Sequence, residues 1–212
     1  MNAVGRLPAV ARPALAASGL ILVVFVLAHL AGVVLAAINP AVFEAYATAL
    51  HAKPWLPVVE WALAVVAVLH LALTAAVVIS NRQAGNRAVL VSRRADPVAA
   101  LAARTAPWSG SVLLVFVLVH LRQLRWPRPA SGEEWARLLQ ALDPAWALLL
   151  YGAAGVALGL HLFHGGEAAH RSLGWLDSAS RDPIRSTTRW LAAVVGGGFV
   201  LVTLVLAAQG GR

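Results

Sequence analysis

Residues 18–30 read SGLILVVFVLAHL, and residues 109–121 read SGSVLLVFVLVHL. Nine of the thirteen aligned positions are identical, and the two stretches lie 91 residues apart. Leucine and valine match by chance between apolar helices, so the similarity rests on the shared pattern S-G…F-x-x-x-H-L. A repeated apolar run of this kind predicts membrane-spanning helices with an internal duplication.

The composition of the whole chain agrees with a membrane protein. Of the 212 residues, 60% are hydrophobic and 12% are charged, with a mean hydropathy of +0.75. A soluble domain carries about twice that share of charged residues, so the composition excludes an ordinary globular protein. The sequence contains no cysteine, which excludes a disulfide scaffold, a covalently attached c-type haem, a Cys-ligated iron–sulfur cluster and a thiol nucleophile.

Five stretches are long enough to cross a hydrocarbon core of about 30 Å. They are expected at about 14–38, 56–80, 105–126, 144–166 and 190–211. None shows the period-two alternation of a membrane barrel, so an all-α membrane protein with five transmembrane helices is predicted. The first apolar run has 25 residues. The apolar region of a cleaved signal peptide has about 7–15 residues, so this run is expected to be a retained helix.

The distribution of basic residues predicts the orientation in the membrane. Placing the N-terminus in the cytoplasm leaves eleven lysines and arginines inside and six outside. The positive-inside rule therefore favours a cytoplasmic N-terminus, with the C-terminus on the other side. The net charge of +8 is explained by this topology, and nucleic acid is not an expected partner.

Each of the first four spans carries one histidine well inside it: His29, His70, His120 and His161. The 91-residue offset recurs between His70 and His161, which indicates two copies of a helical hairpin in parallel orientation, with the fifth span outside the repeat. A single histidine in a span could simply hydrogen-bond two helices together. Four at a repeated spacing favour ligands, since ionisable residues inside a membrane are costly and usually functional.

The depth of each histidine predicts how they pair. At 1.5 Å per residue, His29 and His120 fall in the outer half of the membrane, and His70 and His161 fall in the inner half. Zinc requires about four ligands and dinuclear bundle sites require several carboxylates. A porphyrin supplies four nitrogens itself and needs only two axial histidines. The sequence therefore predicts two b-type haems stacked within a four-helix bundle.

Small and aromatic residues surround these histidines. Phe25 and Phe116 each precede a histidine by four residues and could pack against a porphyrin or simply fill the bundle core. Several glycines could let a flat macrocycle approach the backbone, or could serve close helix packing, which is equally common in membranes. These glycines are Gly32, Gly155, Gly159, Gly165 and Gly166.

These motifs resemble the dihaem cytochrome b membrane anchor of succinate:quinone oxidoreductases (succinate dehydrogenases and fumarate reductases), in its five-helix, single-subunit form. The resemblance covers nearly the whole chain. It comprises the run A-x-x-G-L…F-V-x-x-H-L-x-G at 16–32, Asn81-Arg82 after the second histidine, R-T…S-G…F-x-x-x-H-L at 104–121, and H-L-x-H-G…L-G at 161–174. The chain departs from the family at Val33, where asparagine is frequent, and at Gly159, where some fumarate reductases have glutamate.

The resemblance implies the roles and the partners. His70 and His161 would hold a proximal haem near a cytoplasmic iron–sulfur subunit, and His29 and His120 would hold a distal haem. It implies a flavoprotein carrying FAD, an iron–sulfur protein with its clusters, and a membrane quinone, usually menaquinone. It also implies the bacterial cytoplasmic membrane, and complexes of this family can form higher oligomers.

Three polar residues near the expected outer haem are candidates for quinone contact: Glu44, Glu60 and Arg122. His51 is also available there, and Glu60 is a carboxylate about one turn inside a span. Two other functions stay open. One is a dihaem cytochrome of another membrane oxidoreductase, of the hydrogenase or formate dehydrogenase type. The other is a haem-free transporter that uses its histidines, although transporters usually have broken helices and mid-membrane carboxylates.

Overall fold

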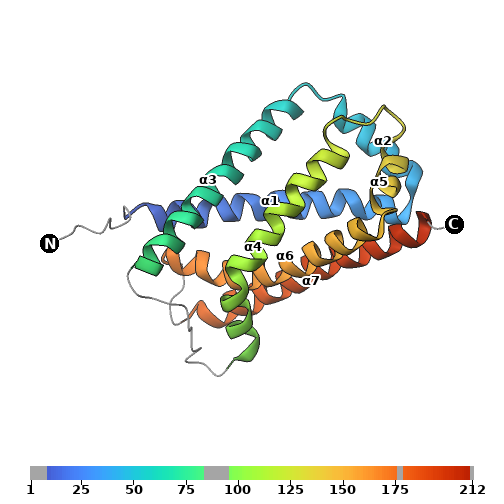
Figure 1. The fold of residues 1–212 in the computed structure, drawn as a ribbon. Helices are drawn as coiled ribbons and strands as arrows, with labels where there is room; N and C mark the ends of the chain where they lie inside the picture. The colour runs from blue at the N-terminus through green and yellow to red at the C-terminus, as the bar shows by residue number, and fades with distance from the viewer. Residues whose placement is uncertain (1–8, 84–95, 176–178, 211–212) are drawn as a thin grey trace.

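The computed structural model describes residues 9–83, 96–175 and 179–210. These residues form seven α-helices and no strand (Figure 1): α1 (Ala11–Ile38), α2 (Pro40–His51), α3 (Leu56–Gln83), α4 (Pro97–Leu124), α5 (Glu134–Leu142), α6 (Ala145–Ser172) and α7 (Arg181–Gly210). Five of them, α1, α3, α4, α6 and α7, are long and apolar enough to cross a membrane. The predicted all-α fold with five transmembrane helices is confirmed.

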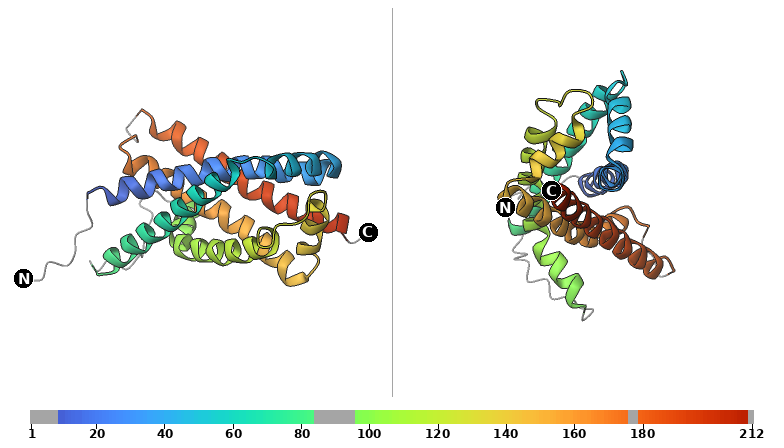
Figure 2. Two further views of the ribbon diagram at one scale, coloured as in Figure 1. Left: turned by 90° about the horizontal axis from the view of Figure 1, so that it is seen from above. Right: turned by 90° about the vertical axis from the view of Figure 1, so that its right-hand side faces the viewer.

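The long helices lie along one another, with α6 in contact with α1, α4 and α7 (Figures 1 and 2). The short helices α2 and α5 lie together where α7 ends, which we call the cap end (Figure 1). The opposite end, where α4 and α7 begin, we call the base end. Helix α3 packs mainly against α1, and Leu56 is its one buried residue. Large apolar side chains such as Trp61 on α3 and Leu149 on α6 are more than 70% exposed, as expected of faces that contact lipid.

The helices extend beyond the apolar spans that the sequence predicts. Helix α4 begins at Pro97 and not near 105, because the Asp96 carboxylate accepts a hydrogen bond from the Ala99 N–H at 3.0 Å and proline suits the first helical position. Helix α6 continues to Ser172, and α7 begins at Arg181. Hydropathy locates the part of each helix in hydrocarbon, whereas caps and polar termini set where the helix ends.

Helix α2 is not among the predicted elements. Its start has a clear signal, since the Asn39 side chain accepts a hydrogen bond from the Val42 N–H at 3.2 Å and Pro40 occupies the first turn. The amphipathic stretch 133–142 forms α5, whose apolar residues Leu138 and Leu142 join the buried core. Together α2 and α5 close the cap end.

Glycines bring α6 and α7 into backbone contact. A Cβ atom on Gly196 would lie 2.8 Å from the Gly159 Cα and 2.9 Å from the Gly155 carbonyl oxygen. Such distances leave no room for a side chain, so these three glycines form the seam between the two helices. The fifth span, although outside the repeat, is therefore tightly joined to it.

Two of the other glycines near the histidines also face protein, and one does not. Gly166 faces Thr188 of α7, and Gly32 faces the ring of Tyr46 on α2. Gly165 has open space beside it. For Gly32, Gly155, Gly159 and Gly166, the contacts therefore support helix packing and not the approach of a macrocycle.

Candidate functional site

The structure brings the four histidines together as two pairs. The ring centroids of His29 on α1 and His120 on α4 lie 5.7 Å apart, with the ring planes at 85°. Those of His70 on α3 and His161 on α6 lie 6.3 Å apart, with the planes at 68°. These are the pairs expected from the depths of the residues. After that expectation we call His70 with His161 the inner pair, and His29 with His120 the outer pair. Each pair joins one helix of the first hairpin to one helix of the second.

Serine hydroxyls hold the histidines of the inner pair. Ser18 Oγ lies 3.1 Å from His70 Nδ1, and Ser109 Oγ lies 3.3 Å from His161 Nδ1. Both bonds link residues 52 positions apart, so the duplicated S-G motif is the partner of the duplicated histidine. The glycine beside each serine leaves room for the ring, since a Cβ on Gly19 would lie 3.2 Å from His70 Cε1.

A tyrosine hydroxyl holds one histidine of the outer pair. Tyr151 Oη on α6 lies 3.2 Å from His120 Nδ1 and donates a hydrogen bond to the Gln123 Oε1 at 3.1 Å. The ring of Tyr151 is buried and lies edge-on to Phe116, with centroids 4.9 Å apart.

These hydroxyls determine which ring nitrogen carries the proton. Ser18 donates its own hydrogen to the Leu15 carbonyl at 2.9 Å, Ser109 donates to the Ala106 carbonyl at 3.0 Å, and Tyr151 donates to Gln123. When the hydroxyl hydrogen takes this acceptor, the hydroxyl oxygen accepts from the histidine beside it, and Nδ1 carries the hydrogen. The lone pair is then on Nε2. This is the arrangement of a metal-ligating histidine, whose other nitrogen donates to a fixed acceptor.

Phenylalanines enclose the outer pair. Phe25 stacks on His29 with ring centroids 5.5 Å apart, and Phe116 lies 5.3 Å from His120. Phe199 of α7 lies 6.0 Å from His29, so the fifth span also contributes to this site. An apolar wall of this kind lowers the local dielectric and limits the access of water.

The ligand set suits a porphyrin better than a bare ion. Within the described residues, no group of three or more His, Cys, Asp or Glu could hold a metal ion. Each pair supplies two imidazoles, which is the number that porphyrin iron requires. Two rings that bind one metal ion from opposite sides through bonds of about 2 Å have centroids about 6 Å apart. The observed 5.7 and 6.3 Å fit this value.

The two pairs are stacked along the bundle. The inner pair lies at the level of Ser18 and Ser109, and His29 and His120 each follow one of these serines by eleven residues. At 1.5 Å per residue, the pairs are separated by about 16 Å along the helices.

Of the three predicted quinone residues, Glu60 is fully engaged by protein. Arg125 holds its carboxylate with two hydrogen bonds, at 2.9 and 2.5 Å, and Arg128 adds a third at 3.3 Å. The cluster ties the start of α3 to the end of α4. Arg122 is exposed and donates to the Trp126 carbonyl at 2.8 Å, whereas Glu44 and Glu60 are bonded to other residues.

Glu44 anchors α5. Its carboxylate accepts hydrogen bonds from the backbone N–H groups of Glu134 and Trp135 at 3.3 and 2.7 Å, which are free donors at the start of that helix. Glu134 in turn accepts from Gly132 N–H at 2.8 Å and lies 3.2 Å from His51 Nδ1. Glu44 is thus a capping group that reaches across from α2.

The pKa values of Glu44 and Glu134 are shifted in opposite directions. Burial, and then the hydrogen bond with Glu134, raise the pKa of Glu44. Burial acts in the same direction on Glu134 but is outweighed by hydrogen bonds from Glu44, Gly132 and His51, so the pKa of Glu134 is lowered. Of the two carboxyls, Glu44 is therefore the first to bind a proton as the pH falls. The stabilising effect of that proton is fully present below the ordinary glutamate pKa and is lost as the pH rises through the raised value.

Replacing Glu44 with alanine should detach the start of α5. Loss of a helix cap costs about 0.5–2 kcal/mol, and we expect that loss in the free energy of unfolding. Glu133→Ala is the matched control, since Glu133 stands at the formal capping position without a side-chain cap bond. Chemical unfolding of both variants in detergent would test this, and equal stability of the two would contradict the capping role.

Two further histidines, His164 and His170, lie in the last part of α6, although the sequence alone favours loop positions for both. His170 Nδ1 donates to the Gly166 carbonyl at 2.7 Å, and its ring lies 5.7 Å from that of Trp175. Neither residue belongs to the two pairs.

The fold and the site together define a class: a five-helix membrane protein built on a duplicated hairpin, with two histidine pairs across the bundle. No protein-family model, curated protein or solved structure matches the chain.

Proposed function

We propose that the chain is a dihaem cytochrome b that carries electrons between an iron–sulfur subunit and a membrane quinone, as the anchor of a succinate:quinone oxidoreductase. The observation that carries the proposal is the pair of stacked histidine sites, in which hydroxyls orient three of the four imidazoles with Nε2 available. Haem b, when bound at both pairs, would supply one-electron transfer across the membrane.

The protein's own contribution is to fix the ligands and exclude water. His70 and His161 would hold the haem nearer the base end, and His29 and His120 the haem nearer the cap end. Ser18, Ser109 and Tyr151 hold three of the imidazoles in place, so a haem bound there would change charge with little reorganisation of its ligands.

The assignment of partners rests on the sequence resemblance and on the charge distribution. The base end would face the cytoplasm and receive the iron–sulfur subunit, with its flavoprotein beyond. A quinone would react at the outer pair. At that end of the bundle, Glu44 belongs to the cluster at the start of α5, and Glu60 belongs to the cluster with Arg125 and Arg128.

Replacing Ser109 with alanine should alter the inner haem alone. The Nδ1–H···Oγ bond makes His161 a stronger donor to iron, so its loss should raise the midpoint potential and weaken haem binding by about 10–100-fold. Ser111→Ala is the control, because Ser111 is exposed and bonds only the Pro107 carbonyl of its own helix. A redox titration would show one shifted and one unshifted haem. If both serine variants behave alike, the positioning role is wrong.

The complex can be identified by its electron donor. The tagged chain would be purified with its partners from native membranes, and succinate, formate or hydrogen would be added. Succinate should reduce both haems, and a flavoprotein and an iron–sulfur protein should co-purify. Reduction by formate or hydrogen instead would establish the alternative, a dihaem subunit of another oxidoreductase. If the isolated complex contains two haems that none of the three reduces, the succinate assignment fails while the dihaem assignment stands.

A further inference from the structure

A groove runs along the outside of the α6–α7 seam. At the base end, a cavity of about 390 Å³ is lined by Arg185, Ser186, Arg189 and Trp190, with Asp182 at its edge. A second cavity, of about 490 Å³, continues toward the cap end between Phe163 and Leu204. Both include Arg189 and Ala193, so they form one continuous groove.

The apolar part of the groove follows from the glycine seam. Gly159 and Gly196 remove the side chains that would otherwise fill the space beside the contact between the helices. Gly197 also lines the groove, and a Cβ added there would meet nothing within 4 Å. The remaining wall is aliphatic, with Val200 and Leu201 on α7. The groove therefore suits a hydrocarbon chain.

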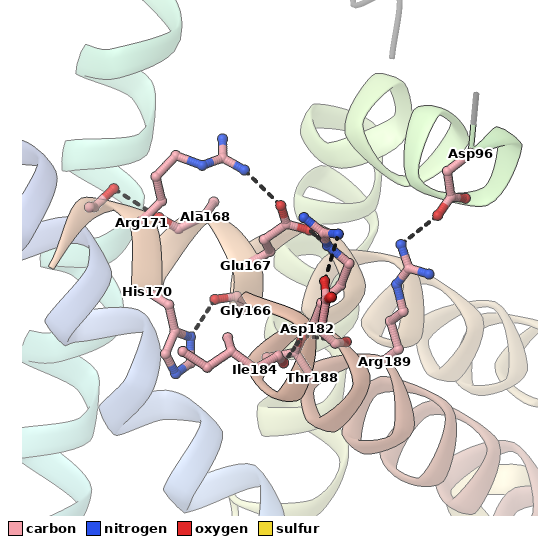
Figure 3. Close-up of polar contacts among 12 residues, drawn as sticks. Asp96, Gly166, Glu167, Ala168, His170, Arg171, Asp182, Ile184, Thr188 and Arg189 are labelled. Atoms are coloured by element: carbon pink, nitrogen blue, oxygen red, sulfur yellow. Dashed lines mark hydrogen bonds and ion pairs between the residues drawn. The ribbon is translucent and has the colours of Figure 1, made fainter. Parts of the chain in front are cut away.

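The mouth of the groove carries two arginines that carboxylates hold in place, as Figure 3 shows in part. Arg189 donates to Asp96 at the start of α4 and lies over the ring of Phe163, 5.0 Å from its centroid. Arg185 is held by Glu167 at 3.3 Å and lies 3.6 Å from Asp182. The N–H of Ala99 and then the Arg189 guanidinium lower the pKa of Asp96, so this pair stays charged.

Each guanidinium group remains partly exposed beside the ion pairs that hold it. The side chains of Arg189 and Arg185 are 35% and 19% exposed and line the mouth, where the phosphate of a lipid can approach them. The Asp182 side chain is 92% exposed, and a phosphate can displace it from Arg185 because exposed ion pairs are weak. Arginine is well suited to phosphate oxygens.

The dimensions match a lipid. From Arg189 to Leu204 the groove follows fifteen residues of α7, or about 22 Å, which is more than half of a hydrocarbon core of about 30 Å. Trp190 is 70% exposed beside the arginines, as expected of a side chain at the membrane–water interface. A charged mouth at the interface above an apolar groove of this length has the form of one phospholipid. A quinone has a neutral head and would make no use of two guanidiniums.

We propose that this groove binds one anionic glycerophospholipid, with its phosphate on Arg185 and Arg189 and an acyl chain along Gly197 toward Leu204. The lipid would join α4, α6 and α7 at the base end, since Arg189 also contacts Asp96. This site is separate from the histidine pairs and does not depend on haem.

Native mass spectrometry of the purified chain would test the site, with phosphatidylglycerol and phosphatidylcholine of identical acyl chains as probes. The wild type should retain one phosphatidylglycerol in preference to phosphatidylcholine. Two arginines near a membrane surface account for about a 30-fold preference for phosphatidylglycerol over phosphatidylcholine. The double variant Arg185→Gln, Arg189→Gln should lose this preference. Arg122→Gln, at an exposed arginine of the cap end, should retain it.

The arginine substitutions also remove the ion pairs of Arg185 and Arg189, and this loss could disturb folding. A second variant leaves those ion pairs intact. Gly197→Leu fills the apolar groove without touching the arginines and should reduce retention of both lipids. Equal retention of the two lipids by the wild type, or unchanged retention by Gly197→Leu, would overturn the proposal. A retained quinone in place of phospholipid would do so as well.

Discussion

His161→Ala should leave the chain with one haem in place of two. His161 and His70 form the inner pair, so removing one imidazole leaves a single axial ligand, while the outer pair at about 16 Å along the helices is untouched. Succinate-driven quinone reduction should fall to background, because in the proposed function the inner haem would carry electrons from the iron–sulfur subunit to the outer haem. Pyridine haemochrome analysis would give the haem content.

His164→Ala is the matched control, three residues further along the same helix and outside both pairs. It should retain two haems with unchanged spectra. Two haems in His161→Ala, or the loss of one in His164→Ala, would show that the ligand assignment is wrong.

Gly196→Ala should cause the largest loss of stability among small substitutions. The added methyl group would lie 2.8 Å from the Gly159 Cα, which is backbone and cannot turn aside. Overpacking of this kind costs about 1–3 kcal/mol, and the better helix propensity of alanine offsets about 1 kcal/mol at most. Because Phe199 follows Gly196 by one turn and contacts His29, the outer site should also be disturbed.

Gly197→Ala is the control that separates overpacking from the change in helix propensity. It makes the same change in helix propensity at the next position, where an added Cβ meets nothing within 4 Å. Thermal unfolding in detergent should show a lower melting temperature for Gly196→Ala only. If the two variants melt together, α6 and α7 are not in backbone contact.

The spans and the pairing of the histidines could be predicted from sequence because both depend on regularities along the chain. Hydropathy over about twenty residues reports burial in lipid, and an equal offset of 91 residues reports a duplicated hairpin. Given the helix directions, the depth of a histidine is a matter of counting residues. Binding of haem at the two pairs stays a prediction.

The contacts that orient the histidines could be predicted from the sequence only in part. The duplicated S-G motif stood out in the sequence, yet its link to the histidine 52 residues later depends on how α1 meets α3 and how α4 meets α6. Tyr151 and Gln123 carried a weaker signal, since a tyrosine buried in a span needs a hydrogen-bond partner.

The polar groups of the cap end show what sequence position cannot convey. Glu60 is an isolated carboxylate in its span, and its partners Arg125 and Arg128 come 65 and 68 residues later. Glu44 likewise caps a helix that begins 90 residues further on. A charge inside a span indicates that a partner exists, but the tertiary fold decides whether that partner is a substrate or another side chain.

The most direct test of the account is the haem content of the purified chain, from a reduced-minus-oxidised spectrum with pyridine haemochrome quantification. The account predicts two b-type haems for each chain, with the spectrum of bis-histidine ligation. A well-folded preparation that takes up no haem would contradict it and would favour a transporter that uses its histidines directly.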